Sequence, residues 1–514
     1  MLEPHDPGPA PNSLGIVREF FDRLNATEVS YCHWKSNEHL AAALAGATDL
    51  DILVDRRTAP RLMRILGDLD FNRCAAVPQR AYPGVEDFLG FDSDTGGLAH
   101  LHLHHQLVLG ERQLKGYRLP WEDVLLSTRR LDPDHRMYVA DPNLEMLLLA
   151  VRTALKLRTR DLARLGPGRP GFRGAGLREF RWLAERVDAE QLFSTARSLV
   201  GEEAARSLSQ FATSIPTVRE LRALLRCASP GLHEYRTYAP ADGLRRRWSR
   251  EWGTRWGKIS DRYLTVASPS KHTLPQGGLV VAFVGCDGSG KSTLVEATVE
   301  WLSWKLDVLP IYFGSGNGPA SLLRQPLLLL KSLRRATRRH TKGIATSRPW
   351  QPAPAEQGRD GPGRRLRLRD ALWDLVVARE RRNRLAQARR ARNLGMVVIC
   401  DRFPQCQLLG FNDGPRLSGW QHHPSPILRT VANSEMATYR ATEWSPPDLV
   451  LKLRVAPEVA AQRRPEMARE SISRRIEAIE SLRFPSATRI VDIDTNHPLE
   501  QVLLQVKRAI WECL

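Results

Sequence analysis

Short apolar runs alternate with helical periods through the second half of the chain. Apolar segments with a β-branched bias are typical of buried parallel strands, and spacings of three and four residues are typical of amphipathic helices. The predicted strands lie at 280–284, 308–318, 396–403, 447–455 and 487–494. The predicted helices between and after them lie at 294–302, 372–394 and 499–511. This alternation predicts an α/β fold with a doubly wound parallel sheet.

The first half has a different pattern. Leu14–Leu24 has the period of an amphipathic helix, and Asp49 and Asp51 alternate with Leu50 and Ile52 as in a short strand. Helical periods dominate further on, at 141–165, 177–187, 190–200 and 217–227. We therefore expect an α+β domain with a helical appendage.

These patterns give the expected domains. Residues 1–140 form the α+β domain, 141–237 a helical domain, 238–277 a basic Trp-rich linker and 278–514 the parallel α/β domain. Within the last domain, a Pro- and Gly-rich stretch near 319–365 is expected to be a disordered, solvated insertion.

Composition indicates the cellular environment and the classes of partner to expect. The chain has 514 residues, a formal charge of +19 and seven cysteines. The cysteines form no CxxC pair, which favours a reducing, cytoplasmic setting. We expect neither a secretory leader nor a membrane span. The excess charge is mostly arginine spread along the chain and no nucleic-acid reader motif accompanies it, so we expect no specific nucleic-acid binding.

The linker contains Trp248, Trp252 and Trp256 at helical spacing among several arginines. We expect an interdomain helix that packs its tryptophans, with peripheral contact to a membrane surface or a polyanion as the alternative.

The strongest chemical motif is GxxxxGK[ST], formed by Gly285, Gly290, Lys291 and Ser292. It stands between a strand and a helix, where backbone N–H groups can surround a polyphosphate. Lys291 is placed to reach the β- and γ-phosphates of ATP, and Ser292 to bind Mg²⁺. The other residues of the expected ATP site are Asp287, Gly288, Ser289 and Thr293.

A second feature follows a later strand. Asp401 and Arg402 come directly after the apolar run Val397–Cys400, at the carboxyl end of a predicted parallel strand. Such a position lies at the mouth of the sheet beside the phosphate loop. We expect Asp401 to hold Mg²⁺ and Arg402 to pair with a phosphate of the acceptor.

GCDGSGKST followed by VICDRF resembles thymidylate kinase and related nucleoside monophosphate kinases over residues 278–514. The resemblance implies that Asp287 contacts the acceptor and that Arg463 and Arg464 are lid arginines. Some relatives have an arginine where Gly288 stands, so the lid would have to supply the cation here. The loops YFGSGNG and PQCQLLGFNDGP differ from the family's acceptor-binding segments, which leaves the acceptor open.

GATDLDILV resembles the active-site strand of DNA-polymerase-β-like nucleotidyltransferases, in particular an uncharacterised bacterial branch. The resemblance implies that Asp49 and Asp51 bind Mg²⁺. The family's third carboxylate is replaced by His100 or His102. Together with His104 these histidines share one face and are compatible with a metal site, but no further ligand is identifiable. We interpret them as polar residues of a half-exposed strand.

The leading hypothesis is ATP- and Mg²⁺-dependent phosphoryl transfer to a nucleoside monophosphate or a related small phosphate ester. Two alternatives stay open. One is a nucleotidyltransferase that acts through Asp49 and Asp51, and the other is a regulatory ATP-binding switch that phosphorylates no metabolite. The oligomeric state is not predicted.

Overall fold

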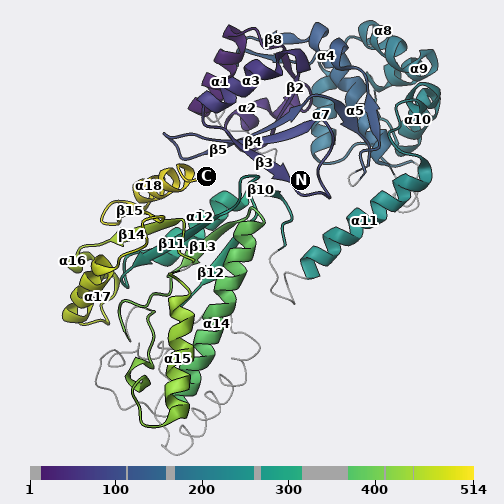
Figure 1. Cartoon of the computed structure of the whole chain (residues 1–514). Helices are drawn as coiled ribbons and strands as arrows, with labels where there is room; N and C mark the ends of the chain where they lie inside the picture. Colours follow the sequence, from purple (N-terminus) through teal and green to yellow (C-terminus); the bar gives the residue numbers. More distant parts are fainter. Residues whose placement is uncertain are drawn as a thin grey trace, which may run out of the picture. The chain divides into compact units, whose positions relative to one another are not determined.

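The computed structural model describes residues 13–111, 114–157, 168–212, 214–259, 268–314, 368–409, 413–443 and 445–514. The chain divides into two compact units, Met1–Arg262 with Ser270–Pro275, and Tyr263–Pro269 with Gln276–Leu514 (Figure 1). The expected insertion near 319–365 lies outside the described residues.

The first unit is built on a mixed sheet of eight strands in the order β10-β3-β4-β5-β2-β1-β9-β8. Its centre is β5, which pairs in parallel with β2 and antiparallel with β4. The strands are β1 (Tyr31–His33), β2 (Leu50–Val54), β3 (Asn72–Ala76), β4 (Val85–Phe91), β5 (Leu98–His104), β8 (Arg130–Asp132), β9 (Met137–Val139) and β10 (His272–Thr273). A separate hairpin consists of β6 (Leu107–Leu109) and β7 (Tyr117–Leu119).

Helices cover this sheet and then form the expected helical region. Cys32 and Trp34 of the sheet region share one buried cluster with helices α5 and α7–α10, so the helical region and the sheet have a common core. The helices are α1 (Gly15–Ala26), α2 (Leu40–Leu44), α3 (Ala59–Asp68), α4 (Glu122–Thr128), α5 (Pro142–Lys156), α7 (Ala175–Ala184), α8 (Ala189–Val200), α9 (Glu202–Ser209), α10 (Val218–His233) and α11 (Pro240–Ile259).

Helix α11 presents two of its tryptophans on the surface of the first unit. Trp248 and Trp252 are 63% and 56% exposed, and the side chain of Trp256 lies outside the described ones. Arginines make the described contacts of this helix instead, because Arg247 donates to Glu111 at 2.5 Å and Arg250 lies over the ring of Tyr82.

The second unit has a five-stranded sheet, all parallel, in the order β12-β13-β11-β14-β15. This confirms the predicted fold class. The strands are β11 (Leu279–Gly285), β12 (Val308–Tyr312), β13 (Val397–Asp401), β14 (Leu449–Arg454) and β15 (Arg489–Asp494). The helices are α12 (Lys291–Ser303), α14 (Leu368–Asn393), α15 (Pro426–Arg440), α16 (Pro457–Arg463), α17 (Arg469–Ser481) and α18 (Leu499–Trp511).

Strand β11 occupies the middle of this sheet, and every one of its residues is buried. Val280, Ala282 and Val284 share a core with residues of α14 and α17 on one face. Right-handed crossovers then place α12 on the other face, where it contacts α18. The chain leaves β11 toward β12 and later crosses to β14, so the carboxyl end of β11 is the switch point at which such sheets bind ligands.

Across the described ranges, no helix is both long enough and apolar enough to cross a membrane.

Two glycines of the first unit should respond oppositely to alanine. A Cβ on Gly90 would lie 2.4 Å from the ring of buried Phe71, whereas a Cβ on Gly67, in α3, would meet nothing within 4 Å. Gly90→Ala should lower the free energy of unfolding by about 1–3 kcal/mol through overpacking. Gly67→Ala should raise it by about 0.5–1 kcal/mol through helix propensity. Urea midpoints of the two variants check this, and equal shifts would contradict it.

Candidate functional site

The loop after β11, where the sequence predicts a phosphate-binding turn, contains two glycines with positive φ. Gly288 and Gly290 have φ values of 88° and 80°, which side-chain-bearing residues rarely adopt. A Cβ on Gly285 would lie 2.6 Å from the hydroxyl oxygen of Ser289, a residue that is itself fully buried. The glycines therefore allow the chain to fold tightly between β11 and α12. Ser292 and Thr293 follow on the exposed side of the first turn of α12.

Lys291 begins α12 and is 7% exposed. Its Nζ donates to the carbonyl oxygens of Gly285 at 2.7 Å and Cys286 at 2.6 Å. Burial lowers the pKa of Lys291 to about 8, and the positive charge of Arg402 acts in the same direction. The ammonium group thus lies inside the loop that it is expected to serve.

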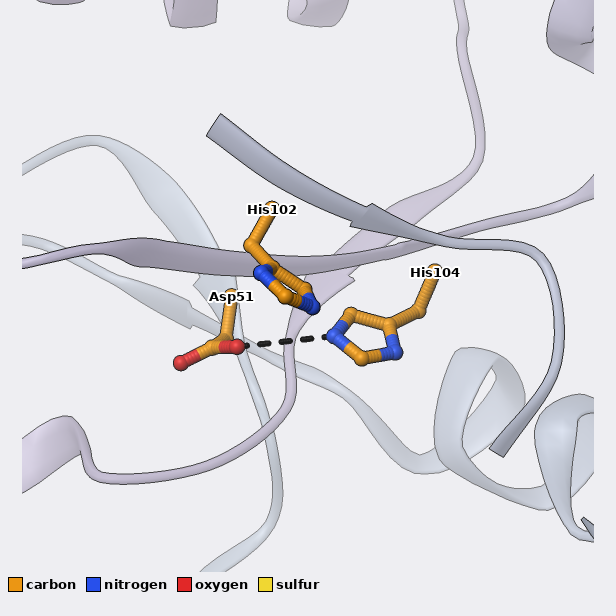
Figure 2. A group of neighbouring side chains, drawn as sticks. All are labelled: Asp51, His102 and His104. Carbon is orange, nitrogen blue, oxygen red and sulfur yellow. Dashed lines mark ion pairs between the residues drawn. The ribbon is translucent and has the colours of Figure 1, made fainter. Parts of the chain in front are cut away.

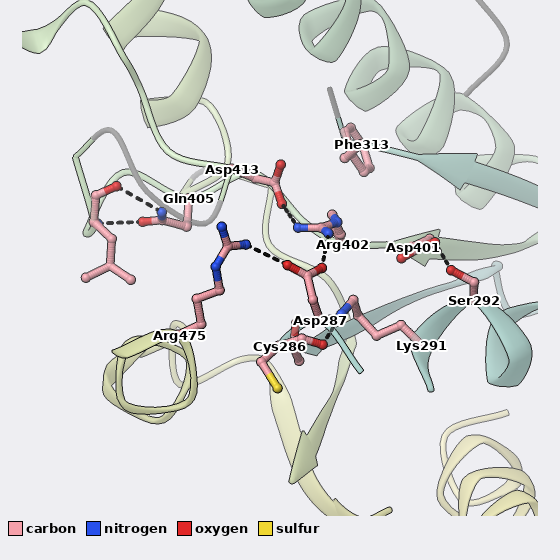
Figure 3. Close-up of polar contacts among 12 residues, drawn as sticks. Cys286, Asp287, Lys291, Ser292, Phe313, Asp401, Arg402, Gln405, Asp413 and Arg475 are labelled. Carbon is pink, nitrogen blue, oxygen red and sulfur yellow. Dashed lines mark hydrogen bonds and ion pairs between the residues drawn. The ribbon is translucent and has the colours of Figure 1, made fainter. Parts of the chain in front are cut away.

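Ser292, at the amino end of α12, and Asp401, at the carboxyl end of β13, lie next to each other (Figure 3). The parallel register pairs Asp401 with Phe283, and the Ser292 hydroxyl donates to Asp401 Oδ2 at 3.3 Å. The other carboxylate oxygen, Oδ1, is buried and has no hydrogen-bond partner among the described residues. Burial raises the pKa of Asp401, and the charges of Lys291 and Arg402 only partly oppose this.

Two arginines bind Asp287 in the loop (Figure 3). Arg402 donates to Oδ1 at 2.9 Å, and Arg475 of α17 donates to Oδ2 at 2.6 Å. Burial alone would raise the pKa of Asp287, but the charges of Arg402, Lys291 and Arg475 outweigh it and lower the pKa. The carboxylate therefore stays ionised between two guanidinium groups.

Asp413 is a second carboxylate partner of Arg402. Arg402 has a left-handed backbone with φ of 70°, and its Nη1 lies 3.3 Å from Asp413 Oδ2. The other oxygen of Asp413 accepts from Arg381 at 2.8 Å, and the Arg381 side chain is 3% exposed. Arg381 also donates to Phe313 O at 3.0 Å and to the hydroxyl of Tyr439. The site thus contains an alternating series of three arginines and two aspartates.

The predicted lid arginines differ in their contacts. Arg463 donates to Gly288 O at 3.2 Å and to Thr495 O at 3.0 Å, so it lies at the phosphate loop. Arg464 pairs with Glu466 at 3.4 Å and is exposed. A Cβ on Gly288 would lie 3.0 Å from Ala460 O, which together with its positive φ explains why no side chain occupies this position.

Sequence reasoning missed Arg475 and Asp413. Arg475 lies one α-helix beyond the predicted lid pair, in the same basic stretch, and only the packing of α17 brings it to the loop. No local pattern links Asp413 to Arg402, which stands eleven positions earlier in the sequence.

In the first unit, the structure brings Asp49 and Asp51 to different partners. Asp49 pairs with His100 at 2.8 Å. Asp51 lies 2.7 Å from Lys35 Nζ and 3.4 Å from His104 Nε2. The expected half-exposed strand is wrong, because His100 and His104 are 2% and 1% exposed in the middle of the sheet. Asp87 of β4 is a further buried carboxylate beside these histidines that the sequence did not indicate.

Comparison with known proteins gives distant relatives. No protein-family model matches the chain. It is 28% identical over 255 residues to the uncharacterized ATP-binding protein YghR of Escherichia coli K12, over 48% of this chain and 91% of that protein. It is 27% identical over 242 residues to the uncharacterized ATP-binding protein YghS of the same strain, over 46% of this chain and 93% of YghS. These relatives therefore correspond to about half of the chain.

Asp413 should be important for stability because it neutralises a buried cation. Asp413→Asn would leave the charge of Arg381 without its carboxylate and should lower the free energy of unfolding by about 3 kcal/mol or more. The matched control is Asp492→Asn, which removes an exposed pair with Arg454 and should cost under about 1 kcal/mol. Urea unfolding of both variants measures the difference, and a cost for Asp413→Asn no larger than the control's would contradict the buried pair.

Proposed function

We propose that the second unit binds ATP with Mg²⁺ and transfers a phosphoryl group to a small phosphorylated acceptor such as a nucleoside monophosphate. The observation that carries this proposal is the meeting of Ser292, Asp401 and Lys291 at the switch point of the sheet. The name of the relatives YghR and YghS, ATP-binding protein, supports the nucleotide but specifies no reaction.

The residues fit a magnesium ion. The Ser292 hydroxyl and the Asp401 carboxylate are 3.3 Å apart, and one oxygen of Asp401 is buried without a partner among the described residues. Oxygen ligands of this kind are those that Mg²⁺ prefers. When bound there, Mg²⁺ would neutralise charge on the phosphate oxygens.

Cationic side chains of the protein would stabilise the remaining negative charge of the phosphates. Lys291 would exchange its two carbonyl contacts for phosphate oxygens of ATP. Arg463 already lies at Gly288 and would offset charge on the transferring group. Arg402 and Arg475 meet at Asp287, and we infer that this side of the loop receives the acceptor phosphate. Transfer would proceed in line, without a covalent enzyme intermediate.

The direct test combines binding and turnover. Calorimetry with ATP and Mg²⁺ should show that Lys291→Ala weakens binding at least about tenfold, the value expected for loss of a charged contact. Lys305→Ala is the matched control near the other end of α12 and should bind as the wild type does. ADP release should then depend on one member of a panel of nucleoside monophosphates and sugar phosphates, and should disappear in Lys291→Ala.

Each result has a clear meaning. ATP binding without stimulation by any acceptor would contradict the kinase and favour the regulatory switch. A nucleotidyl product that is lost in Asp49→Asn and kept in Lys291→Ala would move the chemistry to the first unit. No ATP binding at all would overturn the proposal.

The depressed pKa of Lys291 predicts proton uptake on ATP binding. The free protein has a Lys291 pKa of about 8, so roughly half of the molecules are neutral at pH 8. Phosphate oxygens stabilise the ammonium form and raise this pKa, so binding should take up about half a proton at pH 8. ATP affinity should therefore fall as the pH rises above 8. Calorimetry in buffers of different ionisation enthalpy measures the uptake.

Lys291→Arg is the control for this effect, because its side chain stays charged throughout the range. It should show no uptake from this position. Equal uptake in the wild type and in this variant would assign the proton to another group.

A further inference from the structure

We propose that the first unit contains a binding site for a nitrogen-preferring divalent transition-metal ion, with Asp51, His102 and His104 as its protein ligands. One ligand atom from each of these side chains lies within 4.8 Å of the others. Figure 2 shows the two imidazole rings next to each other and Asp51 approaching from the neighbouring strand. Small side-chain rotations would bring the three atoms onto a common shell of about 2 Å radius.

The sheet register produces this arrangement. Asp51 of β2 is paired with His102 of β5, and His104 lies two residues further on the same face of the strand. The His102 and His104 rings stack with centroids 4.6 Å apart. Since two hydrogen-bonded strands fix all three positions, the ligands are held before any ion arrives.

Unpartnered nitrogens point to a missing ligand. Both ring nitrogens of His104 lack a hydrogen-bond partner among the described residues, and the residue is 1% exposed. His104 Nε2 approaches Asp51 at 3.4 Å without hydrogen-bond geometry, and Nε2 of His102 also lacks a partner there. A buried polar atom without a partner destabilises the fold, and coordination to an ion would remove that penalty.

Asp87 orients one of the ligands. Its Oδ1 lies 3.2 Å from His102 Nδ1, and its residue is 4% exposed. Metal-bound histidines usually have a carboxylate beside the ring nitrogen that does not bind the metal, and Asp87 stands on that side of His102. Asp87 is therefore a positioning residue rather than a ligand.

Lys35 competes with the ion. Its Nζ lies 2.7 Å from Asp51 Oδ1, the same oxygen that faces His104. Its positive charge neutralises the carboxylate and opposes a divalent cation. A site of this design binds its ion more weakly than the same ligands would without the lysine.

The donor set selects the kind of ion. Two imidazoles and one carboxylate suit Zn²⁺ and similar first-row ions, whereas Mg²⁺ prefers oxygen ligands alone. Three protein ligands leave a coordination position for water or for an oxygen of another molecule. The side chains of Asp51 and His102 are 15% and 22% exposed, so this position is near the surface.

The test uses the full-length protein after chelator treatment, with Co²⁺ as a visible probe. We expect one equivalent of Co²⁺ to produce visible absorption, Zn²⁺ to remove it and an excess of Mg²⁺ to leave it unchanged. His102→Gln and His104→Gln should each weaken binding at least about tenfold, and Asp87→Asn about tenfold or more with unchanged stoichiometry. The matched control is His105→Gln, whose imidazole pairs with Glu86 outside the group and should have no effect.

The Lys35→Met variant tests the proposal independently if a histidine variant fails to fold. Removing the competing charge should strengthen Co²⁺ binding at least about threefold. The proposal is overturned if the wild type takes up no Co²⁺, if Mg²⁺ displaces it as readily as Zn²⁺, or if both histidine variants bind as the wild type does. Unchanged or weaker binding in Lys35→Met would likewise contradict coordination through Asp51.

Discussion

Neutralisation of buried charge is the constraint that shapes the second unit around its phosphate loop. Arg381 and Lys291 are both almost fully buried, and each needs acceptors that the surrounding backbone and carboxylates provide. Asp413 and Asp287 each satisfy two cations, so the arginines on either side are held in fixed directions. Three arginines can therefore lie close together, because two carboxylates offset the repulsion between them.

The first unit meets the same constraint with different chemistry. Around β5, the carboxylates Asp49, Asp51 and Asp87 face histidines and Lys35 instead of arginines. Imidazole can be neutral or charged and can bind a metal, whereas guanidinium stays charged and binds oxyanions. The ligands proposed for the two units differ accordingly, a polyphosphate for the second and a transition-metal ion for the first.

The sequence was informative wherever the signal was local. The periods of the β11 strand and of α18 predicted both elements, and GxxxxGK[ST] located the loop between β11 and α12. Prediction from the sequence failed where segments that are distant in the sequence meet in the fold. Asp87 reaches His102 only because β4 pairs with β5, and no periodicity encodes that pairing. The alternation LAHLHLH suggested one solvated face, but Trp34 packs against His104, and both His100 and His104 are buried.

The contacts of Lys291 with Gly285 and Cys286 bear on how fast the site can be filled. The Lys291 ammonium group donates to two carbonyl oxygens of its own loop, and these hydrogen bonds stabilise the conformation of the turn. In the proposed ATP complex, phosphate oxygens would replace these carbonyls as partners of Lys291 without ordering a segment of backbone. The association rate would then be limited by diffusion and by electrostatic steering from the surrounding arginines. Sequence changes in the loop would mainly alter the dissociation rate.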